Sequence, residues 1–529
     1  ALAGALIVVL VIAVAWAQSV PTPTKAMQRA QAVINARLLR GHTEFLAHDL
    51  LEGRAPGTRG GDLAAHYIAA QFARMGLRPA GENGTYFQYV PMLGKTVEPD
   101  SATLRVERAG EVQSFTYFDD FVLFTDRTDP QMEASGELVF AGYGIVAPEY
   151  DWNDFRDVDV KGKILVLLVN DPPATPAEPR LFGARALTYY GRWTYKFEEA
   201  ARQGARGVIL IHTNESAGYP WQVVQSSWSG EQFELPRQPG DLPPLEVKAW
   251  IRRQVAEKIL ALAGQDLEAL QQAAVRRGFR PVALGLRVSS ALTQSVRRLR
   301  SPNVLGLLPG GHEKYAQEYV LYTAHYDHLG VGPPDESGDA IYNGAADNAV
   351  GVAALLAIAE AMTRLAAGEE GLIERYLSGK KAAVRSQLFV AVTAEESGLL
   401  GSAYYARNPI VPLARTVACI NIDGLNTWGP TEDILIIGSG TSELDDVARI
   451  VSRDRGLTIR VDPHPEQGYF YRSDQFSLAK VGVPALYFDP GLQVKGKPEG
   501  YGGQKEQEYR ENDYHQPSDE IKPDWDWAG

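Results

Sequence analysis

The sequence predicts an α/β fold, a three-layer sandwich of helices around a mixed, largely parallel sheet, with a smaller β-rich domain inserted into it. After Pro302, apolar runs of strand length alternate with helical patterns. Parallel strands require such helical connections, so this alternation indicates a largely parallel sheet. Between Gly136 and Gln272 the texture changes to short strands and turns, which indicates the inserted domain.

The composition is that of a globular protein with a sizeable core. A chain of 529 residues, 45% hydrophobic and 22% charged, corresponds to roughly two to four domains. Its 52 basic and 65 acidic residues give a net charge of -13. Nucleic-acid binding needs clustered Lys and Arg, so this charge argues against a nucleic-acid partner.

The first segment, residues 1–17, carries no charge and ends in Ala15-Trp16-Ala17, a small-x-small pattern that signal peptidase recognises. We expect a signal peptide, and hence a secreted or periplasmic protein without stable membrane association after cleavage. A retained anchor is the alternative, but the run is at the short edge of the ~20 residues that span a bilayer. The sole cysteine, Cys419, has no intramolecular disulfide partner.

The domain boundaries follow from these changes in texture. We expect residues 18–135 to form the N-terminal part of the main domain, 136–272 the inserted domain and 273–529 the rest of the main domain. Strand-like runs at 140–145, 162–169 and 208–211, a helix at 196–202 and a helical stretch at 245–277 make up the insertion. The alternative is that this segment continues one large domain.

The N-terminal region from Lys25 to about Gly76 has a helical pattern, interrupted by a glycine-rich loop at 52–61. A phosphate cradle is the tempting interpretation of this loop. The Walker spacing and its Lys-Ser/Thr pair are absent, so a structural loop is predicted.

In the main domain, the predicted strands end at polar residues that carry metal or acid-base chemistry. We expect strands at 319–323, 387–392, 417–422, 434–437 and 484–488, and a helix at 348–365. In open α/β sheets the ligand crevice lies at the carboxyl ends of the strands. The residues brought there are His325, Asp327, Glu395, Glu396 and Asp423, with Asp347 at the start of the helix and His515 near the C-terminus.

Carboxylates and imidazoles gathered in one crevice require a cation, because uncompensated buried charges cost several kcal/mol. Two divalent ions satisfy this requirement. Zinc accepts His nitrogen and carboxylate oxygen, and one carboxylate can bridge two ions about 3.5–4 Å apart. Adjacent Glu395 and Glu396 point in different directions on an extended backbone, which suits one for a metal and the other for a water.

The ordered motifs resemble the di-zinc aminopeptidases and carboxypeptidases grouped as metallopeptidase family twenty-eight. The motifs are His325-x-Asp327, Gly344-Ala-Ala-Asp347-Asn348, Glu395-Glu396-x-Gly398, Asn421-x-Asp423 and Tyr514-His515. The resemblance covers residues 295–527 and extends more weakly to 52–79. The segment from 136 to 272 is similar to the protease-associated domain that many members carry as an insertion.

The resemblance implies a zinc-exopeptidase-like fold and a role for each motif residue. Two Zn²⁺ ions are the implied cofactors, with ligands His325, Glu396, Asp423 and His515 and a bridging Asp347. Glu395 is implied as the general base that activates the water between the metals. Asp327 would orient the His325 imidazole, and Tyr514 would hydrogen-bond the oxyanion.

The expected function is therefore an exported zinc aminopeptidase acting on peptide substrates. A carboxypeptidase on the same site is the first alternative, because the motifs do not specify which peptide end is captured. A glutaminyl-cyclase-like acyltransferase and a non-catalytic receptor of the same fold are further alternatives, disfavoured by the full ligand set. We expect His328 to line the pocket or face solvent, and Arg472 to be structural.

Overall fold

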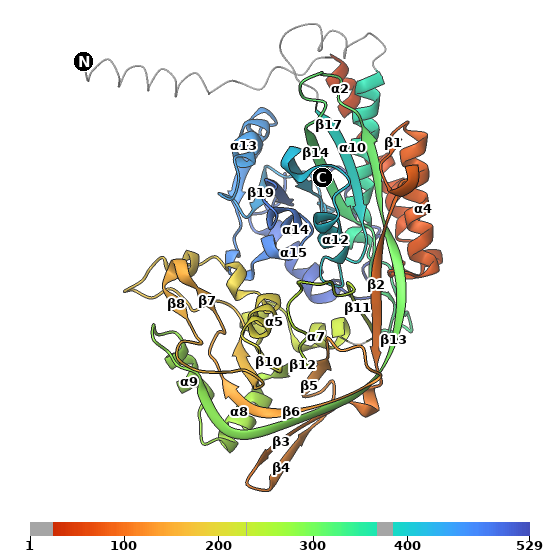
Figure 1. Ribbon diagram of the computed structural model, residues 1–529. Helices are drawn as coiled ribbons and strands as arrows, with labels where there is room; N and C mark the ends of the chain where they lie inside the picture. Colours follow the sequence, from red (N-terminus) through yellow and green to blue (C-terminus); the bar gives the residue numbers. More distant parts are fainter. Residues whose placement is uncertain (1–24, 229, 368–384) are drawn as a thin grey trace, which may run out of the picture.

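The computed structural model describes residues 25–228, 230–367 and 385–529, so the predicted signal peptide lies outside the described residues. The described chain forms two large sheets, each covered by helices, that share one very long strand (Figure 1). This strand, β13 (Val282–Leu308), has 27 residues. Its first half lies in the second sheet and its second half in the main sheet.

The main sheet is mixed, as predicted. Its other strands are β1 (Arg78–Pro79), β2 (Phe87–Val97), β11 (Glu231–Glu234), β14 (Tyr319–His325), β17 (Ser386–Val392), β18 (Thr416–Asn421), β19 (Asp433–Ile437), β20 (Thr458–Val461) and β21 (Ala485–Asp489). The central strands β17, β14, β18 and β21 are parallel to one another. Antiparallel pairs of β2 with β13, β13 with β17, and β19 with β21 flank them. The α/β fold class is confirmed, with the parallel strands at the centre of the sheet.

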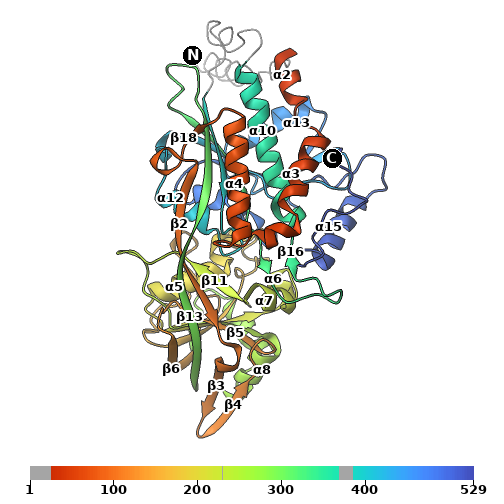
Figure 2. The same cartoon turned by 90° about the vertical axis from the view of Figure 1, so that its right-hand side faces the viewer.

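Helices cover both faces of the main sheet (Figure 2). On one face lie α3 (Ala36–Leu46), α4 (Arg59–Arg74) and α10 (Val350–Ala367), with α2 (Lys25–Gln31) against α10. Phe72, Leu355 and Phe389 belong to the core between these helices and the sheet. On the other face, Tyr405 of α12 (Leu400–Arg407) and Leu478 of α14 (Gln475–Ala479) pack in a second core. The remaining helices of this region are α13 (Leu444–Asp454) and α15 (Tyr501–Asn512).

The second sheet has its own strands, helices and two cores. Its strands are β3 (Thr103–Arg108), β4 (Glu111–Phe115), β5 (Phe121–Phe124), β6 (Gln131–Phe140), β9 (Ile164–Leu168), β10 (Gly207–His212) and β12 (Val247–Arg252). Its helices are α5 (Trp193–Arg202), α6 (Asn214–Ala217), α7 (Trp221–Trp228), α8 (Arg253–Leu262) and α9 (Leu267–Ala274). Alternate residues of each central strand face opposite cores, for example Val166 one core and Leu165 the other. Two short pairs, β7 (Val146–Ala147) with β8 (Trp152–Asn153) and β15 (Gly330–Val331) with β16 (Ile341–Tyr342), complete the strands.

The second sheet uses a wider span of chain than the predicted insertion at 136–272. Its strands run from 103 to 293, because β13 continues without a break from one sheet into the other. Two predicted elements were wrong. The stretch at 245–277 begins with strand β12 rather than a helix, since its alternate residues Val247, Ala249 and Ile251 are buried in the same core. The predicted strand at 140–145 is the end of β6 followed by a turn through Gly142 and Gly144.

One helical segment of the described chain, Ala345–Ala366, is long and apolar enough to cross a membrane. It includes all of α10 except its last residue, and 72% of the apolar window is buried inside the protein. Its apolar character is explained by its position in the core against the main sheet.

Candidate metal centre

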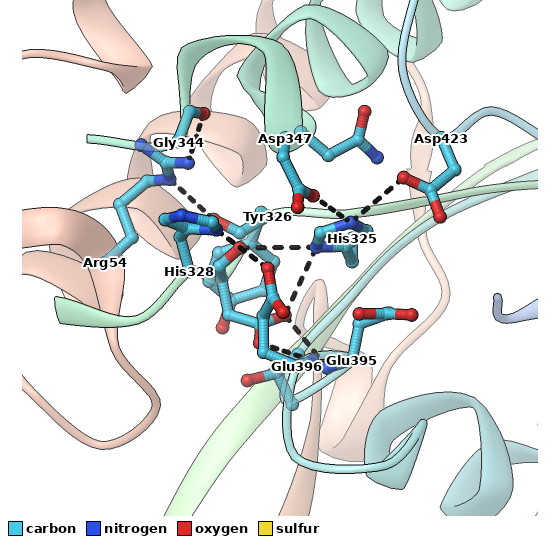
Figure 3. Close-up of polar contacts among 12 residues, drawn as sticks. Arg54, His325, Tyr326, His328, Gly344, Asp347, Glu395, Glu396 and Asp423 are labelled. Carbon is cyan, nitrogen blue, oxygen red and sulfur yellow. Dashed lines mark hydrogen bonds and ion pairs between the residues drawn. The ribbon is translucent and has the colours of Figure 1, made fainter. Parts of the chain in front are cut away.

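The predicted metal ligands gather at the carboxyl ends of the parallel strands. His325 is the last residue of β14, Glu396 follows β17, and Asp423 follows β18. Asp347 lies in the turn Ala345–Ala349, immediately before α10. The last predicted ligand, His515, follows α15 and reaches the same place. Figure 3 shows the side chains of the first four converging from these different segments.

Asp347 is at the centre of this group. One carboxylate oxygen, Oδ1, is 3.2 Å from His325 Nε2, and the other, Oδ2, is 3.3 Å from His515 Nε2. Asp423 Oδ1 is 3.3 Å from the same His325 nitrogen, and Glu396 Oε2 is 3.1 Å from His515 Nε2. The five side chains thus form two adjacent sets, one around each histidine, that share the Asp347 carboxylate.

The solvent-facing position considered for His328 is wrong, because its side chain is fully buried beside Glu396. Its Nδ1 lies 2.7 Å from Glu396 Oε1. The ligand atoms of His328, Asp347 and Glu396 all lie within 4.8 Å of one another, as do those of His325, Asp347 and Asp423. The spacing His325-x-x-His328 after β14 is the signal in the sequence that could have placed this second imidazole at the centre.

The electrostatics of the centre call for positive charge. Burial alone would lower the pKa of His515, but the carboxylates of Glu396 and Asp347 outweigh it and raise the pKa to about 10. Burial would likewise lower the pKa of His325, but the carboxylates of Asp423 and Glu395 outweigh it and raise this pKa well above its usual range. Without a metal, both imidazoles would therefore hold protons in place of cations.

The donor set fits divalent metal. Both ring nitrogens of His515 are buried and have no hydrogen-bond partner within the described residues, although carboxylate oxygens lie close to Nε2. An imidazole nitrogen that faces two carboxylates without donating to them is arranged as a metal ligand. Imidazole nitrogen with carboxylate oxygen is the donor combination that zinc accepts.

Glu395 lies beside the ligands with a different electrostatic environment. Burial raises its pKa well above the usual range, and the neighbouring carboxylates of Glu396 and Asp423 raise it further, while His325 opposes them. In contrast, burial and Asp347 would raise the pKa of Glu396, but His515 and His328 bring it down to about 2. Two adjacent carboxyl groups therefore differ in proton affinity, the separation expected between a proton carrier and a ligand.

Asp327 contacts His325 in a way that partly corrects its predicted role. The nearer acceptor to His325 Nδ1 is the main-chain oxygen of Asp327, at 3.3 Å, whereas its carboxylate is 3.9 Å away. The carboxylate accepts hydrogen bonds from the main-chain N–H groups of Glu395 and Glu396, at 3.1 and 3.4 Å. Asp327 therefore holds the segment after β17 with its side chain and faces the imidazole with its backbone.

Further polar side chains support the ligands from behind. Asp519 accepts from the main-chain N–H groups of Ala346 and Asp347, at 2.9 and 3.1 Å. Ser473 donates to Asp423 Oδ2 at 2.5 Å and accepts from Asn421 Nδ2 at 2.7 Å. Hydrogen bonds of this kind fix the orientation of ligating carboxylates.

Tyr514, the predicted oxyanion partner, stacks on the ring of His515 with ring centroids 4.0 Å apart. Its hydroxyl group makes no hydrogen bond within the described residues and borders the cleft beside the centre. Burial, with the nearby carboxylates of Asp347 and Glu396, raises the pKa of Tyr514 well above its usual range, so the hydroxyl keeps its proton.

A cleft of about 1290 Å³ opens over the centre. Its walls include Asp347, Glu395 and Asp423 from the main domain and the segment 214–223 from the second sheet's helices. The two walls touch where Arg472 Nη2 donates to the main-chain oxygen of Ala217, at 3.2 Å. This volume exceeds the ~300–1,000 Å³ of typical small-molecule sites and suits a peptide.

A shared carboxylate between two histidine-containing sets, at the strand ends of an α/β sheet and under a large cleft, defines a candidate metallohydrolase centre. Residues 303–529 match the family model described as Peptidase family M28. The matched part of the chain contains the whole ligand set, so this region is similar to the metallopeptidases of that family.

Solved structures of similar proteins include an aminopeptidase from Aneurinibacillus sp. strain AM-1, with 19% identity, a TM-score of 0.49, and coverage of 93% of this chain and 90% of that chain. BSAP, a zinc aminopeptidase from Bacillus subtilis, has 18% identity and a TM-score of 0.41, covering 93% and 88% of the two chains. A Peptidase M28 precursor from Shewanella amazonensis SB2B has 16% identity and a TM-score of 0.42, covering 94% and 98%. No curated protein matches the chain in sequence.

Proposed function

We propose that this protein is an exported zinc aminopeptidase that releases N-terminal residues from peptides. The observation that carries the proposal is the Asp347 carboxylate, whose two oxygens face His325 and His515 separately at 3.2 and 3.3 Å. A bridging carboxylate of this kind is typical of two-metal hydrolytic sites, which include aminopeptidases. Glu395, with its raised pKa, stands beside it.

Two zinc ions would be held by His325 and Asp423 on one side and by Glu396 and His515 on the other, with Asp347 common to both. When bound, zinc supplies Lewis acidity that polarises the scissile carbonyl and increases the acidity of water. The buried His328, 2.7 Å from Glu396, fixes the orientation of that carboxylate in this proposal.

The chain's own residues then carry the proton and the developing charge. Glu395 accepts a proton from the attacking water as its oxygen forms a bond to the carbonyl carbon. When the carbon–nitrogen bond breaks, the same carboxyl group gives that proton to the leaving amine, so no proton is gained or lost overall. The Tyr514 hydroxyl, which retains its proton, supplies a hydrogen bond to the carbonyl oxygen as that oxygen becomes negative.

Capture of the amino end is supported by the charge of the cleft wall. The carboxylate of Asp489, at the end of β21, lines the cleft and has no hydrogen-bond or ion-pair partner among the residues that the structure describes. An unpaired carboxylate beside the centre suits a substrate ammonium group.

One observation favours the carboxypeptidase alternative. Arg472 also lines the cleft without an ion-pair partner in the described chain, and a guanidinium group suits a terminal carboxylate.

A panel of blocked peptides separates these two functions. We expect C-amidated peptides to be cleaved and N-acetylated peptides of the same sequence to resist, with activity lost on chelation and restored by zinc. Cleavage of the N-acetylated peptides alone would assign a carboxypeptidase. Full activity in excess chelator would refute the metal mechanism in either case.

Two further parts of the proposal concern the rest of the chain. We infer that the second sheet and its helices form a protease-associated-like domain whose segment 214–223 borders the cleft and contacts part of the substrate.

Export is supported by the uncharged run at 1–17 with its Ala15-Trp16-Ala17 end. Fractionation of expressing cells, with N-terminal sequencing of the mature chain, tests the export.

A further inference from the structure

We propose that Arg54, in the glycine-rich loop at the N-terminal side of the chain, is a positioning residue that holds two metal-ligand loops of the centre in register. The proposal rests on the metal-ligand set of the proposed function. The sequence predicts only a structural role for this loop, and the structure places its arginine directly behind the centre (Figure 3). Arg54 is 1% exposed.

The guanidinium group of Arg54 donates to four main-chain oxygens. Nε donates to Tyr326 at 2.7 Å, and Nη2 donates to Gly344 at 2.9 Å. Nη1 donates to Asn343 and to Leu46, both at 2.5 Å. An arginine side chain has five N–H donors in a rigid planar fork, so four of its five donors are accounted for by these bonds.

The position of these acceptors in the chain gives the bonds their meaning. Tyr326 lies between the ligand His325 and Asp327, immediately after β14. Asn343 and Gly344 lead into the turn that carries the shared ligand Asp347. Leu46 is the last residue of α3, which is packed into the core. One side chain thus ties two ligand-bearing segments to each other and to a helix of the scaffold.

The positive charge of Arg54 is balanced by several carboxylates of the metal centre together rather than by one ion-pair partner. None of its four acceptors is a carboxylate, and it forms no ion pair within the described part of the chain. Burial lowers its pKa to about 10, against the opposing influence of Asp327, Asp519 and other carboxylates of the centre, so it remains charged. A fixed cation behind the ligands offsets part of their mutual repulsion before metal binds.

The loop around Arg54 is fitted to the same segments. A Cβ on Gly53 would lie 2.4 Å from the main-chain oxygen of Gly330 and 2.6 Å from that of Tyr342, so the backbone approach requires glycine. Asn343 Nδ2 donates in return to the main-chain oxygen of Ala47 and to Asp49 Oδ1, at 2.7 and 2.8 Å. The arginine is therefore delivered by a loop that is itself held against the metal-ligand segments.

Removal of the side chain and its chemical replacement test the role of Arg54. Its backbone has φ +54°, in the left-handed region, so glycine fits there without strain. Arg54→Gly leaves a cavity lined by four carbonyl oxygens that free guanidinium ion fills. We expect folded Arg54→Gly to bind zinc roughly 10- to 100-fold more weakly, as for loss of other partners that orient ligands. Guanidinium chloride at millimolar, non-denaturing concentration should restore part of the affinity, and sodium chloride at equal ionic strength should not.

Zinc affinity is measured by titration against a competing chelator, without any peptide. The exposed Arg156 provides a matched control, since Arg156→Gly should change neither the affinity nor its response to guanidinium ion. Wild-type zinc affinity in folded Arg54→Gly would overturn the proposal. A loss of affinity that guanidinium ion leaves unrepaired would overturn it as well.

A second variant covers the case in which Arg54→Gly does not fold. Arg54→Lys keeps the charge but lacks the planar fork, so it cannot serve the four acceptors together. We expect it to fold and to bind zinc more weakly than the wild type, and undiminished affinity would contradict the positioning role. Failure of the proposed function is seen separately, because a wild-type chain that binds two zinc ions and cleaves no peptide would refute the peptidase and leave the Arg54 result intact.

Discussion

The carboxylate of Asp519, ten residues from the end of the sequence, accepts a hydrogen bond from the main-chain N–H of Asp347 at 3.1 Å. The C-terminal segment thereby holds the shared ligand from behind. The other oxygen of Asp519 accepts from the N–H of Ala346 at 2.9 Å, so one side chain holds two successive N–H groups of the turn before α10. The position of Asp347 should respond to changes at Asp519 that leave every metal ligand intact.

We predict that Asp519→Asn weakens zinc binding by roughly 10- to 100-fold. The asparagine side chain has the same shape as aspartate. Its NH₂ group cannot accept a hydrogen bond, so it would face one of the two main-chain N–H donors without bonding to it. Zinc titration with a competing chelator measures the effect, and Asp100→Asn, in the exposed connection between β2 and β3, serves as the control. Equal affinity of Asp519→Asn and the wild type would show that the turn is held without this side chain.

For Glu395→Gln, we predict a protein that folds and binds zinc but turns over peptides roughly 10²- to 10⁴-fold more slowly, the usual contribution of a general base. Glutamine keeps the size of the side chain and cannot accept the proton. The measurement is kcat on an aminoacyl anilide together with the zinc content of the same preparation. A variant with full zinc content and undiminished kcat would remove Glu395 from the proton-carrying role.

Gly53 and Gly76 form a matched pair for testing the glycine-rich loop. Both have positive φ, +65° and +79°, so Ala carries a backbone cost of about 1–2 kcal/mol at either. Only at Gly53 would the new Cβ meet main-chain oxygens, whereas nothing lies within 4 Å of it at Gly76. We expect Gly53→Ala to lower the free energy of unfolding by a further ~1–3 kcal/mol. Urea unfolding of both variants gives the comparison, and equal losses would contradict the close packing of the loop.

The pH dependence of the free energy of unfolding should reveal the raised pKa of the unpaired Asp489 carboxyl group. Burial, with repulsion from Glu506, raises its pKa from 3.8 to about 7. The folded state therefore holds this proton more tightly than the unfolded chain, and the associated stability is complete below about pH 4 and lost as the pH rises to 7.

Asp489→Asn cannot ionise, so it should be more stable than the wild type at pH 7, by the order of 1 kcal/mol for a partly exposed group, and equal to it near pH 4. Urea unfolding at the two pH values measures this difference. A constant difference across the range would mean that the Asp489 carboxyl group titrates normally.

The ligand set could be predicted from the sequence because each apolar run that forms a strand is followed by a polar residue that marks its end. His325, Glu396 and Asp423 each follow a buried run, and parallel strands bring their ends to one edge. Spacing alone does not show which atoms meet. The carboxylate of Asp327 was expected to face His325. It instead accepts hydrogen bonds from the main-chain N–H groups of Glu395 and Glu396, since the turn after β17 passes directly over it.

Arg54 and the long strand could not be found in the same way. Three of the four acceptors of Arg54 are main-chain oxygens about 270 to 290 positions further along the chain, and backbone oxygens leave no trace in residue identity. The middle of β13 reads as polar and charged, with Arg297, Arg298 and Arg300, because residues 295–300 are exposed or only partly covered. Its pairing with β2 is therefore invisible in its hydrophobic pattern.

The continuity of β13 also limits how the cleft can change width. A strand that is hydrogen-bonded in one sheet up to Thr293 and in the other from Gln294 onwards leaves no slack residue at the junction. The two halves of the molecule are therefore joined by a continuous strand rather than by a flexible hinge. We expect the cleft to widen for substrates through small bending of β13, without a rigid-body rotation of one half against the other.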